Sequence, residues 1–417
     1  MEKVKYHTSY RYEPNMEVKT LAIDLIYLLK RDLDNVFNID LMKRMISTTA
    51  TGYETDKEFR DELLRRLIIG YSVNIRDIGN TSMIRFSLTI PKEDLVDDYS
   101  IDSAIEFFKN AIFNPFVEGN GFAKEHFELE KEVLRRNFIN SKNSVYAEAE
   151  RKFMKYIDPD QVLRKDFDYN LNLIDAATPE SVYKFYQDNI VNNNYLLYIG
   201  GCCEESTAKR IYETYFKQET PEFEVELDYY NFFKPTSESY HEEEYEFNQS
   251  ALFMEYLSED VTEENLEYYS IISNILSTQE NDLIFKSLRI DNNLVYVSYA
   301  NKLLYNGIFY VEAYLNERHK DKAIEVVKGV FEKLKDKEFL RTCMDRLIEG
   351  IELDLIRELD RKYQSLETRI NDDLKLRNLE EILEKYKSMD VEEVIKYIDK
   401  IKLNNILFIK EDKDGNN

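Results

Sequence analysis

The apolar residues of the first half follow a helical spacing over much of its length. They recur three and four positions apart, as on one face of an α-helix, in four segments. These segments are Ser103–Phe113, Lys124–Asn140, Val145–Ile157 and Glu180–Asn189. Two shorter segments, Tyr71–Arg76 and Ser82–Pro91, are strand-like, the second with clear apolar alternation, and they flank a turn at residues 77–80. This pattern predicts a β-hairpin.

The second half begins with strands and continues with long helices. Short apolar segments at Ala251–Leu257, Val295–Ala300 and Ile308–Leu315 predict strands. A helical spacing then runs from Asp321 to about Leu374, with one break. Helical runs beside short antiparallel strands are typical of α+β proteins. We therefore expect an α+β fold in which helices pack on mostly antiparallel sheets.

One pattern occurs twice in the chain. TPESVYKFYQDNIVNNNYLLYIGG reads as a capped helix, a polar turn and a strand, and VEEVIKYIDKIKLNNILFIKED repeats it near the carboxyl end. Both copies have adjacent Asn residues before the strand, which is Tyr195–Gly200 in the first copy and Ile406–Lys410 in the second. Self-similarity on this scale indicates a duplicated domain. Two homologous lobes should follow, each with a sheet and its helices.

The break between the lobes is expected at residues 217–240. Pro221, Pro235 and mixed charges interrupt the apolar periodicity there. We therefore predict an N-terminal lobe at 1–216, a linker at 217–240 and a C-terminal lobe at 241–417. A chain of 417 residues is long enough for two hydrophobic cores.

The charge of the chain is strongly negative. With 56 Lys and Arg against 81 Asp and Glu, the net charge is −25, which disfavours nucleic acid and anionic lipid as partners. No apolar run approaches the roughly 20 residues of a membrane span, and the amino terminus lacks the apolar segment of a signal peptide. We expect a cytoplasmic protein with reduced thiols at its three cysteines.

The segment Ser287–Ala300, SLRIDNNLVYVSYA, places Arg289 seven residues before Tyr296. In a strand-like setting, a guanidinium and a phenol can hydrogen-bond the backbone of an extended peptide, and the phenol can stabilise a developing oxyanion. From the residues alone, Arg289 reads more simply as a surface ion-pair partner and Tyr296 as a half-buried core residue.

Metal-assisted peptide hydrolysis sets a stricter requirement. It needs two imidazoles on one helix face and a carboxylate between them, as in His-x-x-Glu-His. The chain has four His, at positions 7, 126, 241 and 319, and no two are four residues apart. A local zinc pair is therefore not expected.

Several segments together resemble the M16 (pitrilysin/insulinase-type) peptidase family. In chain order they are FFKNAIFNPF, FAKEHFELEKEVLRR, TPESVYKFY before YLLYIGG, and SLRIDNNLVY. The resemblance spans nearly the whole chain and is to the shorter members in which two subunits form a clamshell. It implies a substrate-binding role for Arg289 and Tyr296. It also implies one for Asn74, in a strand that adds substrate by backbone pairing, although a hairpin buried under helices explains Tyr71–Arg76 equally well.

In the positions of the family's zinc motif this chain has Asp40, Lys43 and Arg44, and two cations there would repel a metal ion. Glu132 falls where the family has its third zinc ligand, and we interpret it as a remnant. The resemblance thus implies a zinc-free subunit with no cofactor of its own. Such a subunit pairs with a zinc-bearing M16 homologue as a heterodimer and holds peptide substrates, including peptide precursors.

Two other functions stay open at this point. The chain could be a peptide-binding or scaffold protein that has the M16 fold and no proteolytic role. It could also be an independent metalloenzyme with unfamiliar ligands such as Glu132 and His126, which the usual zinc ligand sets disfavour.

Overall fold

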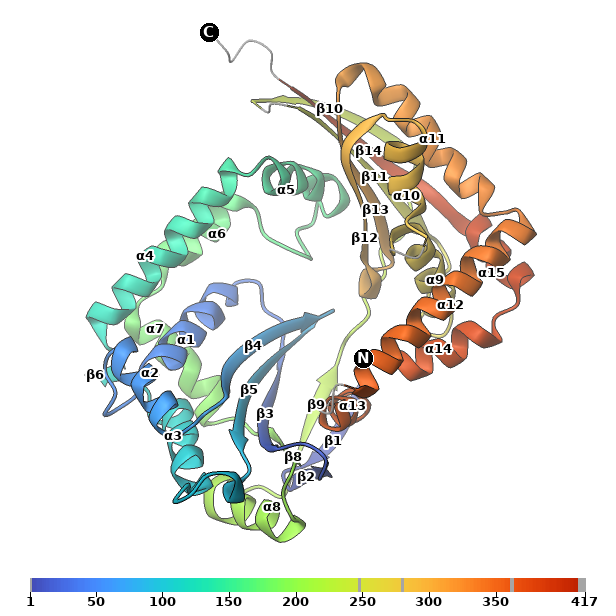
Figure 1. Ribbon diagram of the computed structural model, residues 1–417. Coiled ribbons are helices and arrows are strands. Elements are labelled where there is room, and N and C mark those ends of the chain that lie inside the picture. Colours follow the sequence, from blue (N-terminus) through green and yellow to red (C-terminus); the bar gives the residue numbers. More distant parts are fainter. Residues whose placement is uncertain (1, 247–248, 279–280, 361–363, 412–417) are drawn as a thin grey trace. The chain divides into compact units, whose positions relative to one another are not determined.

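The computed structural model describes residues 2–246, 249–278, 281–360 and 364–411. The chain forms two compact units, and neither is continuous in sequence (Figure 1). Unit 1 comprises Met1–Ser141, Arg164–Tyr229 and Leu359–Leu376, and unit 2 comprises Lys142–Leu163, Tyr230–Glu358 and Arg377–Asn417. The lobes 1–216 and 241–417 and the linker 217–240 stay a prediction. Each compact unit also contains a segment from the other half of the sequence: residues 142–163 lie in unit 2, and residues 359–376 lie in unit 1.

Unit 1 is built from strands of 2 to 11 residues and helices of 7 to 17 residues. Its strands are β1 (Glu2–His7), β2 (Tyr10–Pro14), β3 (Thr20–Lys30), β4 (Gly70–Ile78), β5 (Thr81–Pro91), β6 (Val117–Glu118), β7 (Gly121–Phe122), β8 (Leu196–Gly201) and β9 (Glu222–Leu227). Its helices are α1 (Val36–Thr48), α2 (Asp56–Arg65), α3 (Ile101–Phe113), α4 (Lys124–Asn140), α6 (Phe167–Ala176), α7 (Pro179–Tyr186), α8 (Glu205–Ile211) and α13 (Gln364–Asp373).

Unit 2 combines one sheet with longer helices. Its strands are β10 (Ser239–Tyr245), β11 (Ser250–Ser258), β12 (Val295–Leu303), β13 (Ile308–Leu315) and β14 (Ile401–Glu411). Its helices are α5 (Val145–Ile157), α9 (Leu266–Ser277), α10 (Leu283–Phe285), α11 (Lys320–Lys333), α12 (Lys337–Asp360, whose end passes into unit 1), α14 (Leu379–Ser388) and α15 (Val391–Lys400).

The two main sheets have the same topology. The five strands of unit 1 are ordered β2-β8-β3-β5-β4, and those of unit 2 are ordered β10-β14-β11-β13-β12. In each sheet the first pair is parallel and the other pairs are antiparallel. The repeated sequence pattern corresponds to α7 with β8 and to α15 with β14. The α+β fold with two related, mostly antiparallel sheets is therefore confirmed.

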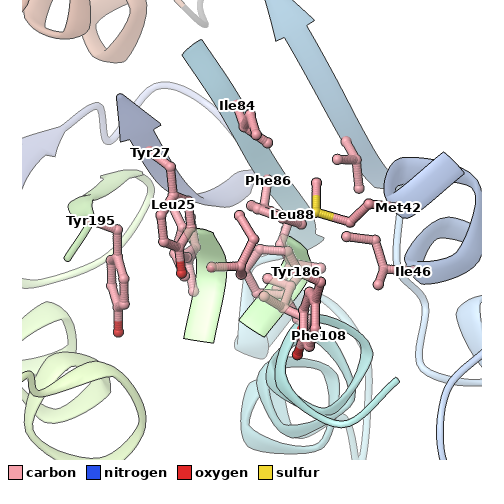
Figure 2. Close-up of a cluster of buried hydrophobic side chains, with 14 of the residues drawn as sticks. Leu25, Tyr27, Met42, Ile46, Ile84, Phe86, Leu88, Phe108, Tyr186 and Tyr195 are labelled. Atoms are coloured by element: carbon pink, nitrogen blue, oxygen red, sulfur yellow. The ribbon is translucent and has the colours of Figure 1, made fainter. Parts of the chain in front are cut away.

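The core of unit 1 lies between one face of its sheet and the helices that cover that face (Figure 2). Alternate residues of β3, among them Leu25 and Tyr27, point to this face because side chains alternate along a strand. Met42 and Ile46, one turn apart on α1, pack from the helix side, as does Phe108 of α3. The apolar residues of the helices and of the strands thus form one buried cluster.

The second face of each sheet is covered by a helix from the other half of the sequence. Helix α5, from the first half, packs on the sheet of unit 2, where Phe153 stacks on Phe253 with ring centroids 4.7 Å apart. Helix α13, from the second half, packs on the sheet of unit 1, where Leu366 lies over Gly200. A Cβ at Gly200 would approach the Leu366 side chain to 3.0 Å and the Glu13 carbonyl oxygen to 2.9 Å, so the helix depends on this glycine.

Charged groups hold α13 in place on unit 1. Arg85 of β5 makes a bidentate ion pair with the buried carboxylate of Asp24, with both N–O distances at 3.0 Å. Its remaining nitrogen donates to Glu367 of α13 at 2.5 Å. At the other end of the helix, Arg11 pairs with Asp373 at 3.1 Å. The bidentate pair fixes the Arg85 guanidinium on the sheet, and its contact with Glu367, together with the Arg11–Asp373 pair, holds α13 against the sheet.

The element predictions are mostly confirmed. The predicted hairpin is β4 and β5, and the four helices of the first half correspond to α3, α4, α5 and α7. The break in the long helical region lies at 334–336, between α11 and α12, whereas residues 361–363 fall outside the described part of the chain. Part of the segment 217–240 forms strand β9, which pairs antiparallel with β1.

A buried carboxyl group stands out on β11. Glu255 is fully buried, and its Oε2 accepts hydrogen bonds from the side-chain amides of Asn404 and Asn405 at 2.9 and 2.5 Å. Its Oε1 has no hydrogen-bond partner among the described residues. Burial raises the pKa of Glu255, because the charged form is poorly solvated, and the two amide hydrogen bonds only partly oppose this.

We expect Glu255→Gln to stabilise the protein at pH 8 and to change little near pH 4. The raised pKa means that the folded protein binds this proton more tightly than the unfolded chain, so the wild type loses stability as the pH rises above the ordinary carboxyl value. Gln retains an acceptor for both Asn residues and does not ionise. The melting temperature at pH 8 should rise by about 2 °C or more.

Calorimetric melting at pH 4, 6 and 8 measures this difference. Glu244→Gln, at an exposed position of β10, is the matched control and should show no such pH-dependent gain. A lower melting temperature for Glu255→Gln at pH 8 would show that the carboxylate stabilises the fold.

Candidate functional site

Helix α1 carries Asp40, Lys43 and Arg44, the three residues that the family resemblance assigns to the zinc-motif positions. Leu41, Met42, Met45 and Ile46 bury one face of the helix in the core of unit 1. Asp40, Lys43 and Arg44 lie off that face and are not fully buried. The helix is therefore kept in place by its apolar residues, whatever side chains occupy its polar face.

Arg44 joins α1 to α4. Its Nη1 lies 3.2 Å from Oε2 of Glu130, and its Nε lies 3.6 Å from Oδ1 of Asp40. One turn along, Thr48 Oγ1 lies 2.9 Å from Nε2 of His126. Burial lowers the pKa of His126. The two helices thus meet through an ion-pair cluster and a hydrogen bond.

The carboxylate that faces α1 is Glu130 and not the predicted remnant. Glu132 keeps 60% of its side chain exposed, and its carboxylate lies 3.9 Å from Arg136 on the same helix. Sequence reasoning missed Glu130, although it follows His126 by four residues and so shares its helix face. The assignment of Glu132 as a remnant stays a prediction from the family resemblance.

The described residues hold no group of three or more His, Cys, Asp or Glu side chains arranged to bind a metal ion. Lys43 and Arg44 add two positive charges to the part of α1 where the family resemblance places the zinc motif, whose ligands are neutral or anionic. Among all the residues that the structure describes, no helix is both long and apolar enough to cross a membrane.

Asn74 lies on β4, the edge strand of the unit 1 sheet. Its side chain is exposed and its Nδ2 donates to Ser72 Oγ at 3.0 Å. Tyr71, Val73 and Ile75 alternate with it and pack against the core. The segment is therefore compatible with both interpretations, a buried hairpin and a strand that pairs with substrate. One face of the strand is buried, and one backbone edge has no partner strand among the described residues.

Arg289 and Tyr296 lie close in sequence in unit 2 but have different surroundings. Arg289 Nη1 donates to the backbone carbonyl of Val295, the first residue of β12, at 2.8 Å, and to Asn293 Oδ1 at 3.3 Å. Tyr296 follows Val295 on β12, an edge strand, and is 59% exposed. The guanidinium therefore fixes the start of the strand that presents the phenol.

The chain thus combines two five-stranded sheets of the same topology with a sequence that contains no His-x-x-Glu-His. A family model described as "Peptidase M16 inactive domain" matches residues 176–350. The chain is 20% identical over 405 residues to the "probable inactive metalloprotease YmfF" of Bacillus subtilis (strain 168), covering 94% of this chain and 93% of that protein.

Solved structures agree in fold. A conserved protein of Enterococcus faecalis V583 superposes with a TM-score of 0.85 at 14% identity, over 99% of this chain and 100% of that chain. A "peptidase M16 inactive domain" of Pseudomonas fluorescens gives 0.74 at 15% identity, over 99% of each chain. The chain is therefore similar to inactive proteins of the M16 peptidase family in sequence, and to M16-like structures in fold.

We expect three substitutions to restore zinc binding: Asp40→His, Lys43→Glu and Arg44→His together. They place two imidazoles four residues apart on α1, opposite Glu130, and remove both cations. Elemental analysis after dialysis against zinc should give close to one zinc per triple-variant chain and far less for the wild type.

The fourth substitution tests which carboxylate completes the site. Glu130→Ala in the triple variant should weaken zinc binding by about tenfold or more, whereas Glu132→Ala should leave it unchanged. Zinc loss with Glu132→Ala alone, or a triple variant without zinc, would contradict the geometry at Arg44.

Proposed function

We propose that the chain is the non-catalytic, substrate-binding subunit of a heterodimeric zinc M16 peptidase that acts on peptides, including the maturation of peptide precursors. In this proposal the zinc lies in a homologous partner that carries His-x-x-Glu-His. The chain supplies surfaces that hold an extended peptide, and it contributes no metal ligand.

The observation that carries the proposal is the exposure of Tyr296. It lies on an edge strand with most of its side chain in solvent, although β12 also contains the buried residues Val295 and Ser298. A phenol held on an unpaired strand edge can donate a hydrogen bond to the backbone of a peptide that pairs with that edge. A core role would not require this exposure.

Arg289 supports the same site in a different way from the one the family resemblance implies. Its guanidinium already bonds the carbonyl of Val295, so it orders the strand beside Tyr296. We propose that Arg289 acts as a positioning residue for Tyr296. Direct binding of the peptide by its remaining donors is the role carried over from the family.

Reconstitution with a zinc-bearing homologue tests this function. In a co-purified complex, Tyr296→Phe should lower kcat/KM for peptide cleavage by about tenfold, since one hydrogen bond to a reacting or bound peptide is worth about 1–2 kcal/mol. Arg289→Ala should lower it at least as much, and Arg289→Lys should restore part of the loss, because an ammonium can still reach the Val295 carbonyl.

Tyr299→Phe is the matched control, since Tyr299 is 48% exposed on the same strand but is not part of the Arg289 and Tyr296 pair. Thermal melting of each variant separates loss of fold from loss of function. Unchanged turnover with Tyr296→Phe and Arg289→Ala would remove the proposed role and leave a peptide-binding or scaffold protein.

A further inference from the structure

A small cavity lies between helix α9 and the sheet of unit 2, near the end of the β12–β13 hairpin. Its volume is about 30 Å³, which is roughly the space that one water molecule takes in the liquid, and it is partly open. Apolar side chains form most of its wall, among them Leu257 of β11, Leu266 and Ile272 of α9, Phe309 of β13 and Phe331 of α11. The cavity therefore has room for a small alkyl group but not for a ring.

Lys302, near the end of β12, is the one charged residue among the described residues that line this cavity. It is exposed, whereas Leu257 and Phe309 are buried, so it lies at the mouth. Its ammonium donates a hydrogen bond to Oδ1 of Asn274 on α9. Lys302 forms no ion pair with the residues that the structure describes. The cavity thus combines apolar walls with a cation that has no counter-ion.

The carboxylate whose charge acts on Lys302 is already neutralised. It belongs to Glu267, which Arg377 holds by two bonds, from Nε at 2.8 Å and from Nη2 at 2.7 Å. Burial and, after it, the charge of Arg377 lower the pKa of Lys302 to about 8, although part of the residue stays exposed. A bound anion would favour the charged form of Lys302, which these neighbours disfavour.

A second carboxylate contacts the wall of the cavity and is balanced as well. Asp260 accepts hydrogen bonds from the hydroxyl groups of Ser258 and Tyr269, which both line the cavity. The same carboxylate forms an ion pair with Lys400. Lys302 is therefore the unbalanced charge of this site, and the site as a whole is positive in a chain whose net charge is −25.

We propose that this cavity binds a carboxylate whose adjoining group is a small alkyl group. The carboxylate pairs with Lys302 at the mouth, and the alkyl group enters between α9 and the sheet. The carboxyl-terminal Val of a peptide and a free short-chain carboxylate share this chemistry. The inference goes beyond the proposed function, because the site needs neither Tyr296 nor a partner subunit.

Fluorescence anisotropy with the full chain tests the proposal. The probes are hexapeptides of Thr and Gln, labelled with fluorescein at the amino terminus, that end in Val, Gly or Phe with a free carboxylate or in Val amide. The Val acid should bind about tenfold more tightly than the Val amide, because a charged group accepts a stronger hydrogen bond than a neutral one. It should also bind about threefold more tightly than the Gly and Phe acids, since Gly leaves the cavity empty and Phe exceeds its volume.

The charge of the chain makes the comparison of acid and amide a strict one. A net charge of −25 repels the acid more than the amide, so a preference for the acid identifies a local cation. Lys302→Met removes the charge and keeps an apolar stem, and it should reduce the preference to about twofold or less. Lys302→Arg should retain most of it. Lys322→Met, at an exposed position of α11, is the matched control and should retain it fully.

Competition with isobutyrate separates the two sources of the carboxylate. A Kd for isobutyrate close to that of the Val peptide assigns the site to free short-chain carboxylates, and a much weaker one assigns it to peptide carboxyl termini. Both results support the shared chemistry. Equal binding of the Val acid and the Val amide to the wild type overturns the inference, as does a preference that survives Lys302→Met. Neither result bears on the proposed function, which is measured by peptide cleavage with Tyr296→Phe in the reconstituted complex.

Discussion

Each sheet of this protein has two faces to bury, and this requirement ties the two halves of the sequence together. Every residue of β11 and β13 is buried, so neither face of the unit 2 sheet is left to solvent along these strands. One face packs on helices of the same half, and the other packs on α5 from the first half. In unit 1, α13 from the second half takes the equivalent place. A separate half of the chain would leave one sheet face uncovered.

The two exchanged helices meet this requirement with similar kinds of contact. Helix α5 packs Phe153 on Phe253 and Tyr310, and its Lys152 forms an ion pair with Glu243 of β10. Helix α13 is held by charged contacts at Arg85 and Arg11 and by the close approach of Leu366 to Gly200. In both places the ion pairs depend on ionised carboxylates, so they weaken at low pH and at high salt, whereas the apolar contacts do not.

The sequence predicts what is local and periodic. The α7–β8 and α15–β14 copies, the hairpin and the helix positions follow from apolar spacing that any buried element must obey. The exchange of α5 and α13 does not, because an apolar helix face does not identify the sheet that covers it. The resemblance singled out Glu132 by its position in the sequence, whereas in the structure Glu130 makes the contact with Arg44. Arg289 was recognised as a candidate, but its bond to the Val295 carbonyl appears only in three dimensions.

Helix α1 is held by its apolar face and needs no metal site to stay in place. Met42 and Ile46 lie in the core, and Arg44 connects α1 to α4 by an ion pair to Glu130. Among the described residues, β4 and β12 each have one backbone edge without a partner strand, and this follows from a strand order that is the same in both sheets. These edges therefore do not depend on which side chains occupy the polar face of α1. The side chains at the two edges differ: β4 carries the exposed Asn74, and β12 carries the exposed phenols of Tyr296 and Tyr299.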